Sequence, residues 1–319
     1  MYEEYYGLIE PPFSLTPDPK YFYRSEAHNR AFELLQYGIQ RREGFLVLYG
    51  DIGTGKTTIC RTVLDTLDKQ TRTALVLNPF LSEMDLLNAI LQDFGIAPAK
   101  DTGATKQDLI NALNIFLLGV LDEGGRAVVL IDEAQNIPLG TLEQIRILSN
   151  LETNKEKLLQ IVLVGQLNLI DVLSKSELRQ LYQRISIKCE LSPLSSDEVG
   201  DYVRHRLAVA GGGNGRVGFS AEGISEVYEY SGGVPRLINL LADRSLLAGM
   251  ALSKNRIDRQ AVQEAAKNLQ IEKRSPFRKS QTPARKRSSA IKRGALVVGL
   301  SILLAIVFIT LMTVFRVTP

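Results

Sequence analysis

The stretch GDIGTGKTT, residues 50–58, combines three glycines with a lysine and three threonines. Glycines let a backbone pass close to a polyphosphate with its amide groups pointing inward, and the start of the following helix adds a favourable dipole. In such a loop the lysine binds the β and γ phosphates and the next threonine binds Mg²⁺, the roles that we expect for Lys56 and Thr57. The alternative is an ordinary glycine-rich turn between a strand and a helix. The candidate nucleotide contacts are Gly50, Asp51, Ile52, Gly53, Thr54, Gly55, Lys56, Thr57 and Thr58.

A second pattern is AVVLIDEAQ, residues 127–135, in which an apolar run ends in Asp132 and Glu133. Ligands of parallel sheets bind where the strands end. Asp132 is suited to holding Mg²⁺, and Glu133 is suited to orienting or deprotonating the water that attacks a phosphate. Two adjacent acids can also simply begin a helix. The phosphate-loop pattern upstream favours the catalytic interpretation.

Four further polar residues are candidates for the same site. Gln166 follows the apolar run QIVLVG and is placed to contact a γ phosphate, or else to satisfy loop backbone. Arg179 and Arg184 precede the run ISIKCEL, and either is a candidate to reach a nucleotide in a neighbouring copy, the alternative being two solvated arginines. Pro235 suits the first turn of a helix, so the next residue, Arg236, lies at the positive end of that helix. A cation is disfavoured there unless an anion is near, which predicts contact with the γ phosphate over an incidental surface position.

These candidates must be held by a sheet and its helices. Five short runs rich in Val, Ile and Leu are separated by amphipathic stretches of helical length, which is typical of an α/β fold with a parallel sheet and helices on both faces. The predicted strands are 44–50, 73–78, 127–132, 160–165 and 185–191. The predicted helices are 26–42, 56–69, 83–94, 106–122 and 139–151, with Ser82 and Thr105 as N-caps.

A different pattern begins after residue 193. Ser195 and Glu198 form a capping box that opens a helix, and no alternation typical of strands follows. We therefore expect two parts, an α/β core with an N-terminal extension over 1–193 and an all-helical lid over 194–270. The predicted lid helices are 195–208, 221–230, 235–252 and 259–269, the last capped by Asp258.

The end of the chain has a third character. Residues 295–315 are 21 residues without a charge, long enough as a helix to cross a hydrocarbon core of about 30 Å. This predicts a single transmembrane helix over 294–315 with a short external tail at 316–319, the alternative being a buried core helix. Residues 271–293 hold nine basic residues and one acid, which predicts a disordered linker that contacts anionic lipid and keeps the preceding residues in the cytoplasm.

Charge and cysteine content argue against other classes of protein. The chain has a formal charge of +3, of which the linker and Arg316 supply +9, so residues 1–270 carry −6. This excess of acids argues against a broadly basic nucleic-acid-binding domain. The cysteines form no CxxC pair and no cluster with the histidines, so we expect no structural metal and no disulfide framework. The residues concerned are Cys60, Cys189, His28 and His205.

The motifs GDIGTGKTT, LIDEAQ, LVGQ, LRQLYQRI, LSPLS and GGVPRLIN, with YYGLIEPPFSLTPDPKYFY before them, resemble the AAA+ ATPases of the general secretion pathway protein A (ExeA-like) group. Relatives in that group serve mannose-sensitive pilus biogenesis and exosortase-linked export. The resemblance covers residues 1 to about 270 and implies a P-loop NTPase (AAA+) fold with a helical lid, ATP and Mg²⁺ as ligands, and a ring or other homo-oligomer. The implied roles are Walker A for Lys56 and Thr57, Walker B for Asp132 and Glu133, sensor 1 for Gln166, arginine finger for Arg179 or Arg184, and sensor 2 for Arg236.

Resemblance and tail together predict a single-pass inner-membrane protein with its ATPase domain in the cytoplasm. Its expected work is to hydrolyse ATP while assembling or remodelling a secretion, pilus or polysaccharide-export apparatus with an inner-membrane or envelope partner. Long members of the group continue into a periplasmic peptidoglycan-binding region, and with only 316–319 after the predicted span we expect no direct peptidoglycan binding. Two alternatives stay open: a nucleotide-dependent oligomeric switch or scaffold with incidental turnover, and, less favoured by the charge, a DNA-linked ATPase related to transposition regulators.

Overall fold

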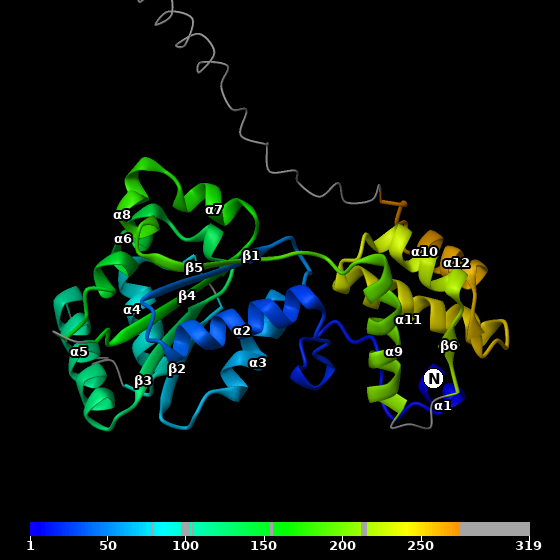
Figure 1. Ribbon diagram of the computed structural model, residues 1–319, viewed down its shortest axis with the longest axis horizontal. Coiled ribbons are helices and arrows are strands. Elements are labelled where there is room, and N and C mark those ends of the chain that lie inside the picture. The colour runs from blue at the N-terminus through cyan, green and yellow to red at the C-terminus, as the bar shows by residue number, and fades with distance from the viewer. Residues whose placement is uncertain (78–79, 97–102, 104, 154–155, 212–215, 275–319) are drawn as a thin grey trace, which may run out of the picture. The chain divides into compact units, whose positions relative to one another are not determined.

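The computed structural model describes residues 1–77, 80–96, 103, 105–153, 156–211 and 216–274. Its centre is a five-stranded sheet in the order β2-β3-β4-β1-β5, with every neighbouring pair parallel (Figure 1). The predicted parallel sheet is therefore confirmed, and the phosphate loop (residues 50–58) follows the strand that lies between β4 and β5. The strands are β1 (Phe45–Gly50), β2 (Thr71–Val76), β3 (Arg126–Ile131), β4 (Leu159–Gly165) and β5 (Ile185–Leu191).

Helices cover both faces of this sheet, as predicted. Because successive side chains of a strand point to opposite faces, β1 sends Leu46 and Leu48 to one layer and Phe45 and Val47 to the other. The first layer contains α2 (Glu26–Gln40) and α3 (Lys56–Thr66). The second contains α4 (Glu83–Asp93), α5 (Lys106–Asp122) and α6 (Leu139–Leu148).

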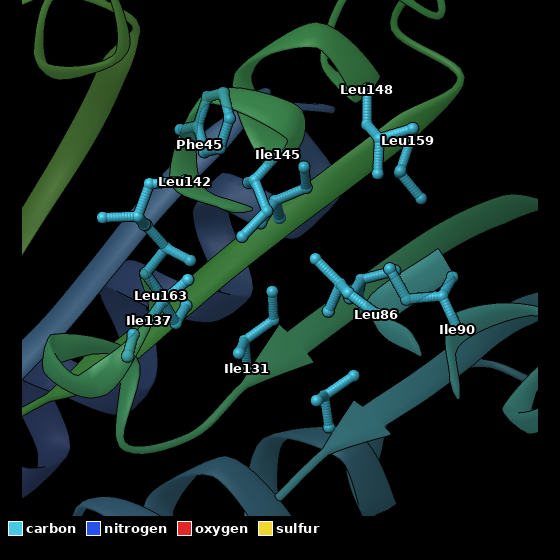
Figure 2. Packing of buried hydrophobic residues seen from close by; sticks show 14 of the residues in the cluster. Phe45, Leu86, Ile90, Ile131, Ile137, Leu142, Ile145, Leu148, Leu159 and Leu163 are labelled. Carbon is cyan, nitrogen blue, oxygen red and sulfur yellow. The ribbon is translucent and has the colours of Figure 1, made fainter. Parts of the chain in front are cut away.

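Figure 2 shows the second layer, in which strand side chains meet those of α4 and α6. Ile131 of β3 and Leu163 of β4 lie beside helix residues such as Leu86 and Leu142, and all four are 2% exposed or less. Removing one such buried leucine side chain costs about 2–5 kcal/mol of unfolding free energy. This dense packing makes the carboxyl edge of the sheet a fixed support for the residues that follow each strand.

The edge strands show where hydropathy alone misplaces a boundary. β1, β3 and β4 are buried almost throughout, whereas β2 is buried at only two of its residues and β5 alternates buried and exposed positions. The strand predicted at 73–78 begins earlier, at Thr71, because Thr71 and Arg72 pair with Arg126 and Ala127 of β3. The ends of an edge strand are set by backbone hydrogen bonds to the neighbouring strand more than by the burial of apolar side chains.

The predicted helix starts on the core are confirmed by their caps. The Ser82 hydroxyl accepts from the Asp85 amide at 3.2 Å. Thr105 and Asp108 form a reciprocal capping box, in which each side chain accepts from the other residue's backbone amide. Each cap satisfies amides that the first helical turn leaves without a partner.

The lid is built mainly from four helices, as predicted, but it is not all-helical. Two short strands, β6 (Gly218–Phe219) and β7 (Arg256–Ile257), pair in parallel. The prediction was wrong here because two-residue strands are too short to show an alternating pattern. The predicted caps are confirmed: Ser195 and Glu198 exchange capping bonds, and Asp258 accepts from the Ala261 amide. The helices are α9 (Ser196–Gly211), α10 (Ala221–Ser231), α11 (Pro235–Ala251) and α12 (Arg259–Asn268).

The N-terminal strap, residues 2–23, packs with the lid. It contains α1 (Tyr2–Tyr6) and the 3-10 turn η1 (Pro19–Tyr21). Tyr6 is fully buried, and its hydroxyl lies 3.1 Å from two carbonyl oxygens, that of Leu246 within α11 and that of Lys254 beyond its end. A division at residue 193 groups this segment with the α/β core, yet its aromatic side chains fill the apolar cluster of the lid.

The end of the described chain lies on the lid. Lys273 Nζ lies 3.0 Å from Glu226 and 2.5 Å from Glu229, both on α10, so the first residues of the predicted linker 271–293 contact folded structure. Among the described residues, no helix combines the length and apolar character needed to cross a bilayer. The predicted span 294–315 and tail 316–319 lie outside the described residues.

Candidate functional site

Lys56 lies within the phosphate loop, where it is the first residue of α3, and is 7% exposed. Its Nζ donates to the carbonyl oxygens of Gly50 at 2.9 Å and Asp51 at 2.8 Å, so the loop wraps around its own lysine. Burial lowers the pKa of Lys56, and the nearby carboxylates of Glu133 and Asp132 oppose that shift. A desolvated cation of this kind gains most from an incoming anion, which a phosphate supplies.

Thr57 and Asp132 lie together at the ends of two elements far apart in the sequence. Thr57 Oγ1 donates to Asp132 Oδ2 at 2.8 Å, and Asp132 is 7% exposed. Asp132 directly follows β3, and its backbone is held in place because its amide donates to the carbonyl of Val76 at the end of β2. A hydroxyl and a carboxylate are hard oxygen donors, so these two residues fit Mg²⁺.

Glu133 has an unusual backbone. Its φ of 52° lies in the left-handed region, which lets the 3-10 turn η2 (Ala134–Asn136) begin at the next residue. Its Oε2 accepts from Gln135 Nε2 at 2.6 Å and from Gln166 Nε2 at 3.4 Å. Gln166, at the end of β4, thus contacts the candidate general base. Gln135 belongs to the LIDEAQ motif, but no pattern in the sequence singled it out.

Arg236 reaches the phosphate loop through its backbone. Pro235 is the first residue of α11, as predicted, and the Arg236 amide donates to the carbonyl of Gly53 at 3.2 Å. Gly53 has a φ of +78°, and a Cβ there would lie 2.7 Å from the Arg236 Cβ. Only glycine therefore permits this approach of lid and loop. The exposed Arg236 side chain makes no hydrogen bond or ion pair with the described residues.

One cavity is lined by the phosphate loop, the lid and the N-terminal strap. The predicted site residues that line this cavity are Ile52, Gly53, Gly55, Lys56, Thr57, Thr58, Glu133 and Arg236. The remaining loop residues do not line it: Gly50 and Asp51 bind Lys56 through their carbonyl groups, and Thr54 is fully buried. Asp132 lies just behind the lining, bonded to Thr57. The structure thus gathers the predicted Walker and sensor 2 residues in one place.

His28 is a residue of this site that the sequence did not reveal. It lines the cavity, is 5% exposed, and its Nε2 lies 2.9 Å from the Thr54 carbonyl, with Nδ1 2.6 Å from Ser25 Oγ. Because a carbonyl only accepts, Nε2 carries the proton and Nδ1 accepts from the serine. Burial lowers the pKa of His28, opposed by the Thr54 hydrogen bond and by Glu198. This neutral imidazole braces the phosphate loop from α2.

Four aromatic residues of the cavity lining, here called the aromatic wall, were also missed. They are Tyr21, Phe22 and Tyr23 of the strap and Tyr202 of α9. Arg206, which is 6% exposed, lies 4.6 Å from the Tyr21 ring centroid and donates to the Pro12 carbonyl at 2.6 Å. The strap sequence entered the prediction only as part of a resemblance, although its density of Tyr, Phe and Pro could have suggested a ring-binding surface.

The two arginine-finger candidates have different surroundings. Arg184 donates to Ser149 Oγ and Asn150 Oδ1, both at 2.6 Å, so it is bound to the end of α6 in the same chain. Arg179 begins α8 (Arg179–Tyr182), is exposed, and makes no side-chain hydrogen bond or ion pair within the part of the chain that the structure describes. Neither arginine lines the cavity, and neither does Gln166.

The AAA domain family matches residues 39–173. General secretion pathway protein A of Aeromonas hydrophila is 47% identical over 257 residues, which are 81% of this chain and 46% of that protein. The chain therefore spans about half the length of this curated relative.

Solved structures show the same fold at low sequence identity. The ORC2 protein of Aeropyrum pernix, in ADPNP–ADP complexes, matches with a TM-score of 0.62 at 16% identity. The match covers 83% of this chain and 73% of the ORC2 chain. Cdc6p of Pyrobaculum aerophilum matches with a TM-score of 0.61 at 17% identity, and the match covers 82% of this chain and 71% of the Cdc6p chain. Fold, sequence match and site geometry lead to one assignment: the chain belongs to the family of general secretion pathway protein A and has an AAA-type P-loop NTPase domain.

Proposed function

We propose that this chain hydrolyses ATP with the help of Mg²⁺. The observation that carries the proposal is the 2.8 Å hydrogen bond between Thr57 and Asp132, which joins the phosphate loop to the end of a neighbouring strand. These two residues would hold the ion together with phosphate oxygens, and the ion would neutralise charge that develops on the phosphates. The buried Lys56 supplies a second positive charge at the same place.

The remaining residues divide the chemistry between the two lobes. Lys56 exchanges its carbonyl partners for the β and γ phosphates, and Glu133 orients or deprotonates the attacking water. Gln166 contacts the γ phosphate region from the end of β4. Arg236 contributes its guanidinium from the lid, so that closure of the lid on the nucleotide completes the positive surroundings.

The base lies against the aromatic wall. Tyr21, Phe22, Tyr23 and Tyr202 line the cavity, and a purine stacks on aromatic surfaces of this kind. Arg206 holds this wall in place through its contacts with the strap.

Hydrolysis is completed by a second copy of the chain. Arg179 is the better finger, because its guanidinium has no partner among the described residues whereas Arg184 is bound by Ser149 and Asn150. A guanidinium inserted from a neighbour stabilises charge in the transition state. The active form is therefore a homo-oligomer, with a ring as the expected arrangement.

The cellular role follows from the relative and the predicted tail. A 47% identity to general secretion pathway protein A supports work on a cell-envelope secretion, pilus or polysaccharide-export apparatus. The uncharged stretch 295–315 and the basic linker support a single-pass inner-membrane protein whose ATPase domain lies in the cytoplasm. The partner is then an inner-membrane or envelope-assembly protein, with anionic lipid against the linker.

The test is Mg²⁺-dependent ATP hydrolysis by the purified full chain, with Glu133→Gln as the key variant. Removing a general base lowers turnover by about 10²–10⁴-fold, while the phosphate contacts remain, so the variant should bind ATP as tightly as wild type. Absence of wild-type hydrolysis under oligomerising conditions contradicts the proposal.

The same variant separates this proposal from a scaffold with incidental turnover. Envelope assembly in cells should fail with Glu133→Gln if hydrolysis does the work, and should persist if the ATP-bound oligomer alone is required. A DNA-linked role predicts salt-sensitive DNA binding by the full chain, which the net charge of residues 1–270 disfavours.

A further inference from the structure

Gln135 connects two strand ends that the proposed reaction uses together. Its Oε1 accepts from the backbone amide of Gln166 at 2.9 Å, and its Nε2 donates to Glu133 Oε2 at 2.6 Å. One amide side chain thus ties Glu133, the second residue after β3, to Gln166, the first residue after β4. No other described residue makes both contacts.

The surrounding backbone is arranged to admit this side chain. A Cβ on Gly165 would lie 2.6 Å from Gln135 Oε1, so the glycine at the end of β4 leaves the space that the amide fills. The left-handed turn at Glu133 starts η2 at once and returns Gln135 toward the carboxylate two residues earlier. A left-handed backbone is strained in a residue other than glycine, and the surrounding contacts offset this strain.

The hydrogen bonds leave one oxygen of Glu133 available. Gln135 and Gln166 both contact Oε2, and no described group donates to Oε1. Of the two contacts, the one from Gln135 is the stronger, since 3.4 Å is at the limit for a hydrogen bond. A lysine or arginine partner would neutralise the carboxylate, whereas the neutral amide of Gln135 orients it and leaves its negative charge in place.

We propose that Gln135 is a positioning residue, which holds Glu133 with Oε1 toward the attacking water and fixes it relative to Gln166. This inference rests on the proposed hydrolysis. Misplacing a reacting group by about 1 Å lowers turnover by about 100-fold, so loss of the Gln135 contact acts on kcat. It leaves nucleotide binding nearly unchanged, because Lys56, Thr57 and Arg236 do not contact Gln135.

Two substitutions separate the two hydrogen bonds. Gln135→Met keeps the length of the side chain and removes both. Gln135→Glu keeps an acceptor for the Gln166 amide, but it loses the donor to Glu133 and places a second carboxylate beside it. Gln70→Met, at an exposed position beyond α3, is the matched control.

The experiment measures kcat and KM for ATP in the full chain, with hydrogen exchange at the Gln166 amide as a second readout. Both Gln135 variants should lower kcat by about 10- to 100-fold with KM changed less than about threefold, while Gln70→Met matches wild type. Exchange at Gln166 should rise in Gln135→Met and stay near wild type in Gln135→Glu. That combination assigns the loss of turnover to the Glu133 contact.

Each part of the inference has its own contradicting result. If wild type hydrolyses ATP and either Gln135 variant keeps or raises kcat, or if KM rises as much as kcat falls, Gln135 does not position Glu133. If exchange at Gln166 is unchanged in Gln135→Met, the link to β4 is wrong. If wild type itself shows no turnover, the proposed hydrolysis fails, and this inference fails with it.

Discussion

The two sides of the nucleotide cavity are held in different ways. On the sheet side, Thr57, Asp132 and Glu133 are joined to their neighbours by side-chain hydrogen bonds and rest on strands packed between two apolar layers. On the lid side, Arg236 meets the phosphate loop through one backbone hydrogen bond to Gly53, and its side chain makes none with the described residues. The sheet side is therefore preorganised, whereas the lid side can adjust to what is bound.

This contrast assigns different work to the two sides. A fixed cluster of charges stabilises phosphate without reorganisation, which favours binding and catalysis. A side chain without a partner gains its contacts only when the ligand arrives, so it reports which nucleotide is present. The N-terminal strap supports this division, since it packs with the lid and also forms the aromatic wall of the cavity.

The largest expected effect is on the sheet side. Lys56→Ala removes the buried cation that the phosphate loop surrounds and leaves phosphate oxygens without their partner. Loss of one member of a buried charge pair costs about 2–5 kcal/mol of binding free energy, so ATP and ADP binding should both fall below detection at micromolar protein. Titration with a fluorescent ATP analogue measures this.

Lys69→Ala, just beyond α3 and exposed, is the control and should bind as wild type. Nearly normal binding by Lys56→Ala would contradict the preorganised sheet side.

An intermediate effect is expected on the lid side. Arg236→Ala removes one charge-assisted hydrogen bond, worth about 1.5–3 kcal/mol, and it should weaken ATP more than ADP because the predicted contact is with the γ phosphate. Competition binding with both nucleotides measures the difference.

Arg244→Ala, exposed on the same helix, is the matched control. Equal losses for ATP and ADP would place Arg236 near another part of the nucleotide and weaken the contrast between the two sides.

The smallest expected effect concerns pH. Burial lowers the pKa of His28 in the folded chain from its ordinary value of 6.5. The unfolded chain therefore takes up a proton as pH falls below about 6.5, and the folded chain resists it, so stability declines by at most about 1.4 kcal/mol per pH unit from this group. His28→Gln should reduce the decline in Tm between pH 7.5 and 5.5, about one unit on either side of that ordinary value.

His205, whose pKa burial and Arg206 also lower, lies on α9 of the lid and serves as the comparison. In His28→Gln, but not in His205→Gln, ATP affinity should also fall, because only His28 bonds to the phosphate loop. Equal effects on ATP affinity would contradict a specific brace on the sheet side.

Much of the sheet side could be predicted from sequence. The nine-residue loop, the strand that ends one residue before Asp132, and the caps at Ser82, Thr105 and, in the lid, Asp258 are local patterns, and the structure forms each of them. Pro235 likewise begins its helix as expected. These features depend on residues within a few positions of one another, where spacing alone fixes geometry.

The missed features have distant partners. His28 lies 26 residues before Thr54, and Arg206 bonds to Pro12 across 194 residues. The pairing of β6 with β7 is too short to leave a pattern. Each needs the folded chain to bring its partners together, so no window of the sequence contains the signal.

The sequence by itself determined the phosphate loop, the strand-end carboxylates and the order of helices and strands, because hydrophobic periodicity and capping act locally. Only the tertiary structure decided that, among the described residues, Arg184 has side-chain partners and Arg179 has none, that the strap lines the cavity, and that Gln135 links two strand ends. The physical reason is that a side chain's role depends on which donors and acceptors surround it. Those neighbours are set by packing between elements remote in the chain.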